Sequence, residues 1–409
     1  MKVVTAIDSF KGSMTSVEAG NAVALGIKRV YPEAEVIVRP LADGGEGTVE
    51  ALIEGMGATR CTVNVTGPLG EPVECQYGMI ESDDVSNCND TDIKNKKTAV
   101  IEMSGAAGIT LVNKEELNPM EASTYGVGEV IRDAIENGCR RFIVGIGGSA
   151  TNDGAVGMLQ ALGYDFLDSE GNSISRGVKG LRDLCRIEDK SVLPELSQCE
   201  FMVACDVTNP LLGENGCSAV FGPQKGATEE MVKEMDQLLG KYVDIARNYF
   251  ECRRMNGDEN ADIVEGYSGN VVDPDYPGSG AAGGMGFAFH TFLNATLRPG
   301  IDIILEETNL EKYIEDANLV VTGEGMLDFQ TAMGKAPVGV ARLAKKYGKP
   351  VIAFAGGVTK DAVACNKEGI DAFFPIVRGV TTLEEAMNPE NAKRNLADTV
   401  EQVMRLMQI

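Results

Sequence analysis

Short apolar runs alternate with helix-like patterns at both ends of the 409-residue chain. A helix is predicted over about residues 15–30, where Thr15 and Glu18 have the spacing of a capping box. The predicted strands of these two ends lie at residues 3–7, 35–39, 319–322, 351–355 and 373–377. Such repeated βα units predict a parallel sheet covered by helices on both faces. We therefore expect both ends to build one discontinuous, doubly wound α/β domain.

The middle of the chain has a different pattern. Residues 66–72 are turn-rich and lie between two strand-like runs, which predicts a hairpin rather than a βα repeat. Further strands are predicted at 98–102, 141–146 and 201–205, and helices at 123–137 and 229–249. We therefore predict two domains: residues 1–66 with 278–409, and residues 67–277 as an inserted mixed α/β domain.

Composition excludes several classes of partner. The net charge is −24 and no stripe of Lys or Arg stands out, so nucleic acid and anionic membranes are poor partners. No apolar run approaches membrane-spanning length. The ten cysteines contain no CxxC pair, which favours reduced thiols and a cytoplasmic location. Polar stretches near 81–97 and 256–277 are predicted to be solvated loops. A homo-oligomer is possible, and the sequence does not decide it.

Glycine-rich loops that carry polar residues follow several predicted strands, where ligands bind in open α/β sheets. Residues 8–13, DSFKGS, offer backbone amides near a helix start together with Lys11, which suits an anion. An ordinary turn with a solvated lysine explains this loop equally well. Residues 43–48, DGGEGT, combine glycines with Asp43, although Thr48 could simply cap a helix.

The loop at residues 145–154, GIGGSATNDG, supports two interpretations. It matches GxGxxA after a strand, with Asp165 twenty residues beyond Gly145, which would suit an NAD(P)-dependent oxidoreductase of a small hydroxy acid. Its extra polar side chains exceed what a pyrophosphate turn needs. A literal GxGxxG at residues 278–286 follows polar sequence, so phosphate binding and close helix packing are equal alternatives there.

Carboxylates follow two further strands: Asp206 after the run ending near 205, and Glu324 and Asp328 after the run ending at 322. Such groups suit proton or metal chemistry, although each could also cap a turn. The only histidine, His290, lies in an apolar stretch, which argues against a Ser-His-Asp hydrolase. No Walker A sequence is present. Phosphoryl transfer remains attractive because it requires positioning, cations and one carboxylate.

Taken together and in this order, the loops resemble the type-1 glycerate kinase family. The matching segments are DSFKGS, LADGGEGTVEA, VTGPLGEPV, GIGGSATNDG, ACDVTNPLLGENG, FGPQKGAT, GSGAAGGMG, LRPGI and VTGEGMLDFQT, which span nearly the whole chain. The resemblance implies a flavodoxin-like domain, a second α/β domain, and an active site in the cleft between them. It also implies ATP, Mg²⁺ and D-glycerate, with 2-phosphoglycerate favoured over 3-phosphoglycerate as the product.

Roles for individual residues are hypotheses under this resemblance. Asp206 would orient the glycerate hydroxyl or accept its proton, and Lys11 would neutralise a phosphate or carboxylate. The acceptor pocket would be lined by Asp43, Ser149, Asn152 and Asp153. The nucleotide would be bound by Ser9, Gly280, Gly283, Gly284, Glu324 and Lys225. Asp328 would bind Mg²⁺. A non-catalytic protein that binds small anions remains the third interpretation, beside the oxidoreductase.

Overall fold

The structure is a computed structural model that describes residues 1–42, 53, 57–81, 97–255 and 271–408. Contacts divide the chain into two compact units, one formed by Met1–Gly57 with Pro299–Ile409 and the other by Ala58–Arg298. Asp43 and most of the polar stretches predicted near 81–97 and 256–277 lie outside the described residues.

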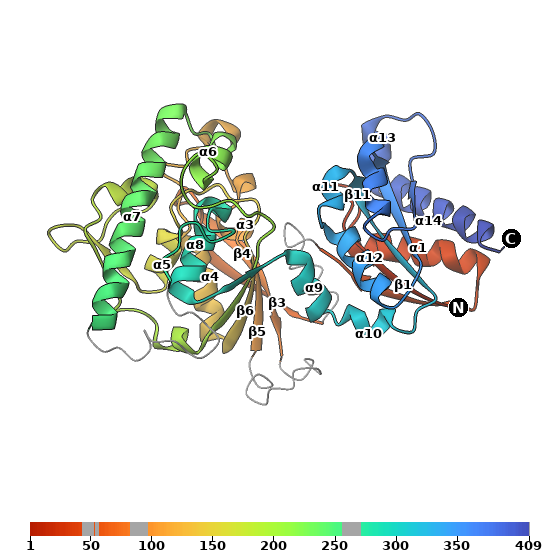
Figure 1. The fold of residues 1–409 in the computed structure, drawn as a ribbon, viewed down its shortest axis with the longest axis horizontal. Coiled ribbons are helices and arrows are strands. Elements are labelled where there is room, and N and C mark those ends of the chain that lie inside the picture. Colours follow the sequence, from red (N-terminus) through yellow and green to blue (C-terminus); the bar gives the residue numbers. More distant parts are fainter. Residues whose placement is uncertain (43–52, 54–56, 82–96, 256–270, 409) are drawn as a thin grey trace. The chain divides into compact units, whose positions relative to one another are not determined.

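A parallel sheet forms the centre of the first unit (Figure 1). Its strands are β1 Lys2–Ile7, β2 Glu35–Pro40, β11 Leu319–Leu327, β12 Val351–Val358 and β13 Ala372–Pro375. They lie in the order β13-β12-β11-β1-β2, and every neighbouring pair is parallel. Counted along the unit, this order is 2-1-3-4-5, which is the flavodoxin arrangement. The predicted parallel sheet built from both chain ends is confirmed.

Helices cover this sheet on both faces. Helix α1 Ser16–Val30 begins with the predicted capping box of Thr15 and Glu18, and it packs beside α14 Pro389–Leu406 (Figure 1). Both helices share a core cluster with Val3, whereas Val4 is buried but lies outside that cluster. Because successive strand residues face opposite sides, a second buried face exists, and α12 Ala336–Lys346 packs against β11 and β1 there. Shorter helices are α9 Gly300–Glu307, α10 Leu310–Ile314, α11 Phe329–Ala332, η9 Lys360–Asn366 and α13 Leu383–Met387.

The second unit contains a mixed six-stranded sheet in the order β10-β9-β6-β5-β4-β3. Its strands are β3 Thr59–Thr66, β4 Pro72–Ile80, β5 Lys97–Glu102, β6 Cys139–Gly145, β9 Glu200–Ala204 and β10 Thr296–Arg298. The predicted hairpin is confirmed because β3 and β4 pair antiparallel. Strands β5, β6, β9 and β10 are mutually parallel. A separate antiparallel pair consists of β7 Asp165–Leu167 and β8 Arg186–Glu188.

Helices and one large apolar core complete the second unit. The helices are α3 Ser104–Ala107, α4 Tyr125–Glu136, α5 Val156–Ala161, α6 Cys217–Phe221, α7 Glu229–Met255 and α8 Met285–Leu293. The 3-10 turns are η2 Ile109–Leu111, η3 Lys114–Glu116, η4 Val178–Arg182, η5 Pro194–Gln198, η6 Pro223–Lys225 and η8 Ala281–Gly283. The predicted helix at 229–249 is confirmed as part of α7, whose apolar face is buried, with Leu239 and Tyr242 among its members. His290 is half-buried and stacks on Tyr276 at 3.8 Å.

The boundaries between the two units differ from those predicted at residues 66/67 and 277/278. Strand β3 hydrogen-bonds to β4 along its whole length, which places it in the second unit. Helix α8 and strand β10 belong there too, because β10 pairs with β9 and α8 packs against β9. The predicted boundary put the glycine-rich sequence at 278–286 in the first domain, but Gly280 and Gly283 pack against Pro210 and Thr151 of the second unit.

Candidate functional site

The carboxyl ends of four parallel strands meet at one edge of the mixed sheet. Glu102 of β5 lies opposite Gly145 of β6, which lies opposite Ala204 of β9, which lies opposite Arg298 of β10. The loops that follow these strands are therefore neighbours. This edge is where ligands bind in open α/β sheets, so we take it as the candidate site of the second unit.

The loop after β6 exposes its glycines and buries its polar side chains. Gly147 and Gly148 are exposed, whereas Ser149 is 8% exposed. The Ile109 amide donates to the Gly148 carbonyl at 2.8 Å, and the Ala150 amide donates to the Ala107 carbonyl at 2.9 Å. These two bonds fix the loop against the segment after β5.

Lys225 lies beneath this loop and is 1% exposed. Its Nζ donates to Ser149 Oγ at 2.7 Å and to the Thr151 carbonyl at 2.6 Å. Burial lowers its pKa to about 8, against the opposing effects of Cys217 and Asp153. Lys225, which was predicted to bind the nucleotide, therefore bonds to the loop after β6 from the interior of the unit.

Asp153 and Asn152 are fully buried, and their side chains form hydrogen bonds within the protein. The Asp153 carboxylate accepts bonds from the amides of Thr124, Ala155 and Gly157 and from the Thr124 hydroxyl. Burial raises the pKa of Asp153, although each of these donors lowers it. Asn152 Nδ2 donates to Ser218 Oγ at 2.8 Å, and its Oδ1 has no hydrogen-bond partner among the described residues.

Asp206 is exposed in the loop that directly follows β9. The loop is held by the Cys205 amide, which donates to the Arg298 carbonyl at 2.9 Å, and by Asn209 Nδ2, which donates to the Asn215 carbonyl at 2.9 Å. The predicted position of Asp206 at the sheet edge agrees with this geometry. Asp206 is thus an exposed residue at the same sheet edge as Ser149.

The glycines at 278–286 are required for close packing. The Gly280 amide donates to the Asn209 carbonyl at 2.9 Å, and a Cβ at Gly280 would lie 2.2 Å from the Pro210 carbonyl oxygen. A Cβ at Gly283 would lie 2.2 Å from the Thr151 carbonyl oxygen, and Gly284 packs against Gly154. The amides of Gly280 and Gly284 donate to backbone carbonyls, which favours the packing alternative at these two glycines. Phosphate binding by the segment stays a prediction.

The dinucleotide fingerprint at Gly145 has the wrong surroundings. The next helix, α5, begins only at Val156, so the glycines do not open it directly. Asp165 begins β7, which pairs antiparallel with β8 outside the main sheet. In a dinucleotide site the acidic residue binds the ribose within the same βαβ unit. The oxidoreductase interpretation is therefore not favoured.

In the first unit, the loop after β1 packs against the second half of β11. The Asp8 amide donates to the Gly323 carbonyl at 2.9 Å, and the Ser9 amide donates to Asp8 Oδ1 at 2.6 Å. A Cβ at Gly325 would lie 3.7 Å from the Lys11 amide nitrogen. The side chain of Lys11 is exposed, as an anion-binding lysine and a solvated one both would be.

Thr331 connects the two carboxylates predicted in this unit. Its Oγ1 donates to Glu324 Oε1 at 2.6 Å, while Asp328 Oδ1 accepts from the Thr331 amide at 3.1 Å and caps α11. The described residues contain no group of three or more His, Cys, Asp or Glu suited to a metal. Mg²⁺ is commonly held by one or two carboxylates together with substrate phosphates, so this pair fits Mg²⁺ only in company with a nucleotide.

Sequence reasoning missed two positions. Thr331 stands three residues after Asp328, a spacing that signals a capping box. Arg298 ends β10 beside Ala204 at the site edge, and its Nη1 lies 3.9 Å from Met202 Sδ. Its place in the LRPGI segment after a short strand was available in the sequence, but only the pairing with β9 brings it to this edge.

Comparison with known proteins gives a consistent result. The profile of the "Glycerate kinase family" matches residues 3–408. The chain belongs to the glycerate kinase family. The resemblance predicted from the loops and the assignment as a kinase of this family are thereby confirmed.

Individual relatives cover nearly the full length of the chain. A glycerate kinase of Halalkalibacterium halodurans is 43% identical over 97% of both chains. The glycerate 2-kinase of Escherichia coli is 43% identical over 99% of both chains. A solved structure assigned as a glycerate kinase 2 of Salmonella typhimurium LT2 superposes with a TM-score of 0.84 at 41% identity, covering 100% of this chain and 98% of that one. Among the described helices, none combines the length and apolarity needed to cross a membrane.

Proposed function

We propose that this glycerate kinase family member transfers the terminal phosphoryl group of ATP to a hydroxyl of D-glycerate, giving 2-phosphoglycerate and ADP. The observation that carries the proposal is the common sheet edge of the second unit. There, exposed glycines and Ser149, with a buried cation beneath them, adjoin the loop that presents the Asp206 carboxylate. Phosphoryl transfer needs this combination of positioning, positive charge and one carboxylate.

Each residue has a role that follows from its environment. Asp206 orients the acceptor hydroxyl and receives its proton, because it is an accessible carboxylate on a loop tied to β10. Ser149 and the amides of the glycine loop bind an anionic oxygen. Asn152 and Asp153 hold that loop in shape rather than line the pocket, since both are fully buried.

The loops of the first unit are proposed to bind the nucleotide. Lys11 and the amide region near Ser9 lie in the loop between β1 and α1, where backbone amides and a cation together favour phosphate. Glu324 and Asp328 would hold Mg²⁺ or contact the ribose. Mg²⁺ bound there would neutralise charge on the phosphates during transfer. The free thiols of the described cysteines suit the reducing cytoplasm, where we place the enzyme.

A coupled assay of ADP release tests the reaction. Purified protein with ATP, Mg²⁺ and D-glycerate should release ADP only when all three are present. Phosphorus NMR of the product then identifies the esterified hydroxyl, because a phosphate at C2 couples to one proton and a phosphate at C3 couples to two. A thermal shift with NAD and none with ATP would instead support the oxidoreductase.

A further inference from the structure

A tight turn fixes the position of Lys225. The turn η6 Pro223–Lys225 ends at Gly226, which has a φ of +92°. A Cβ at Gly226 would lie 2.5 Å from the Leu117 carbonyl oxygen, and a Cβ at Gly222 would lie 2.3 Å from the Ser218 carbonyl oxygen. A side chain at either position would clash with a backbone carbonyl, so the glycines allow the backbone conformation of this turn. The Lys225 side chain therefore extends from a fixed backbone position into the interior.

The Lys225 ammonium has uncharged hydrogen-bond partners. In the described part of the chain it donates to Ser149 Oγ and to the Thr151 carbonyl, both neutral oxygens. Burying a cation without a contacting carboxylate is costly. Buried ionisable groups with strongly shifted pKa values cluster at functional sites. The buried charge of Lys225 therefore suggests a role in function, besides its contribution to packing.

The hydrogen-bond direction at Ser149 follows from chemistry. A lysine ammonium can only donate, so Ser149 Oγ must accept from it. The hydroxyl hydrogen of Ser149 is then directed to another acceptor. Next to it, Gly147 and Gly148 are exposed, and Gly148 has a φ of +73°, which suits an anion-binding turn of successive amides.

We propose that Lys225 is a positioning residue that acts through Ser149, by holding the Ser149 hydroxyl as a donor toward an anionic oxygen bound at residues 147–149. The anionic oxygen belongs to a phosphoryl group or to the carboxylate of the acceptor. This inference rests on the proposed kinase reaction and goes beyond it. Sequence analysis predicted that Lys225 binds the nucleotide directly. Here the effect of Lys225 on the bound anion is indirect, because its ammonium is buried under the loop.

A double-mutant cycle tests the coupling. Lys225→Met and Ser149→Ala should each lower kcat/KM by about 10- to 100-fold, as expected for one charge-assisted bond. The double variant should be no less active than the more impaired single variant, because both substitutions act on the same donor, the Ser149 hydroxyl. Multiplicative losses would overturn the proposal, because they would mean that the two residues act independently. Full kcat/KM in Ser149→Ala would also overturn it.

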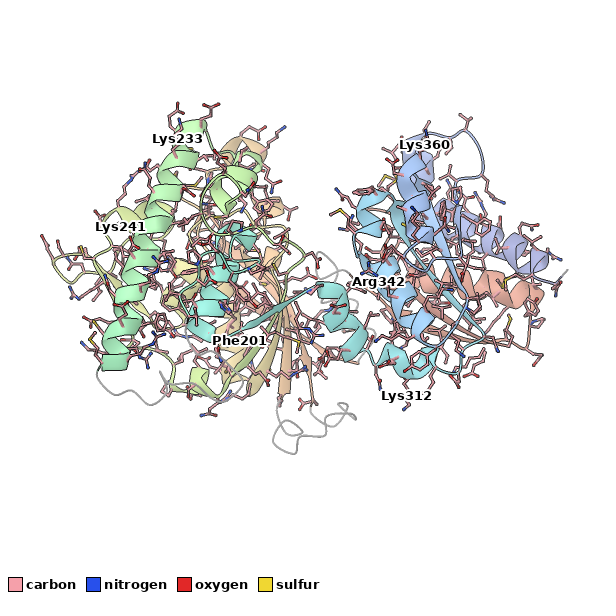
Figure 2. All side chains as sticks on the ribbon, viewed as in Figure 1. Phe201, Lys233, Lys241, Lys312, Arg342 and Lys360 are labelled. Carbon is pink, nitrogen blue, oxygen red and sulfur yellow. The ribbon has the colours of Figure 1, made fainter. Side chains whose placement is uncertain are left out.

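Lys241 provides a matched control in the same unit. It lies on α7 (Figure 2), and its Nζ donates to the carbonyls of Leu181 and Arg182 at 3.2 and 2.7 Å. Lys241→Met therefore removes a similar set of bonds away from the site and should leave kcat/KM within about twofold. If Lys225→Met behaves like Lys241→Met, the proposal fails. Should Lys225→Met not fold, the cycle is repeated with Lys225→Gln: a double variant with Ser149→Ala that is no worse than the more impaired single variant decides for the proposal, and multiplicative losses decide against it.

Binding separates this inference from the proposed reaction. Calorimetry with D-glycerate and with inorganic phosphate compares the wild type with Ser149→Ala and Lys225→Met. If the wild type does not phosphorylate glycerate, the proposed reaction fails; weaker binding of either anion by both variants would still support the inference. Unchanged binding of both anions would overturn it. A loss confined to KM for glycerate identifies the carboxylate, and a loss in kcat identifies the phosphoryl group.

Discussion

Exposed and buried charges at the candidate sites differ in what they can do. Asp206 and Lys11 are exposed on loops after strands, whereas Asp153 and Lys225 are buried around the loop that follows β6. An exposed charge can meet a substrate directly and adds little to stability. A buried charge is bound to the fold and acts on a substrate only through its neighbours. Substitutions in the first group should therefore change kinetics alone, and those in the second should also change stability.

The largest expected effect is that of Asp206→Asn. The amide keeps the size of the side chain but removes its basicity, so kcat should fall on the order of 10²- to 10⁴-fold. Because the residue is exposed, the melting temperature and KM for ATP should change little. Steady-state kinetics and calorimetry measure both quantities. A variant that keeps more than about a tenth of the wild-type kcat would remove Asp206 from the role of base.

Asp153→Asn should mainly destabilise the protein, by roughly 3 kcal/mol. The carboxylate accepts from two amides and one hydroxyl through Oδ2 and from a third amide through Oδ1, and an asparagine would turn one of these oxygens into a donor. Urea unfolding measures the loss. Asp168→Asn is the control, because Asp168 is partly exposed and also accepts backbone amides, from Glu170 and Asn172, so its substitution should cost much less. Equal losses would contradict the distinction between buried and exposed carboxylates.

Lys11→Ala should lower kcat/KM by about thirtyfold if its ammonium binds an anion of the nucleotide or acceptor. The side chain is exposed, so thermal stability should be unchanged. Initial rates measured at varied ATP and at varied glycerate show which ligand is affected. Unchanged kinetics for both would leave Lys11 as a solvated lysine.

The sequence predicted the sheets better than the surroundings of single residues. Apolar runs predicted the parallel strands, because a buried strand is marked by its own local sequence. Thr15 and Glu18 predicted the start of α1 in the same way. The predicted strand end also put Asp206 in the loop after β9, where the structure has it, and its catalytic role stays a prediction. The burial of Lys225 could not be predicted, because it depends on the turn η6, which places this lysine against a loop about 75 residues earlier in the chain. Gly283 could not be assigned to packing without its contact to Thr151.

The smallest expected effect is a pH-dependent stability difference between the wild type and Lys225→Met. The folded-state pKa of Lys225, about 8, lies below the ordinary lysine value of 10.5, so the folded protein binds fewer protons than the unfolded chain between these values. Stability contributed by this residue therefore rises with pH across that window. From about pH 7 to pH 9, the wild type should gain about 1 kcal/mol relative to the methionine variant.

The groups facing the ammonium are Cys217 on α6 and Asp153 on the loop. Burial raises the pKa of Cys217 to about 11, so its own contribution falls at higher pH in both proteins and largely cancels in the difference. Unfolding curves in urea at several pH values measure the gap. A constant gap would show that Lys225 keeps its proton throughout this range, and the lysine would then belong with the exposed charges.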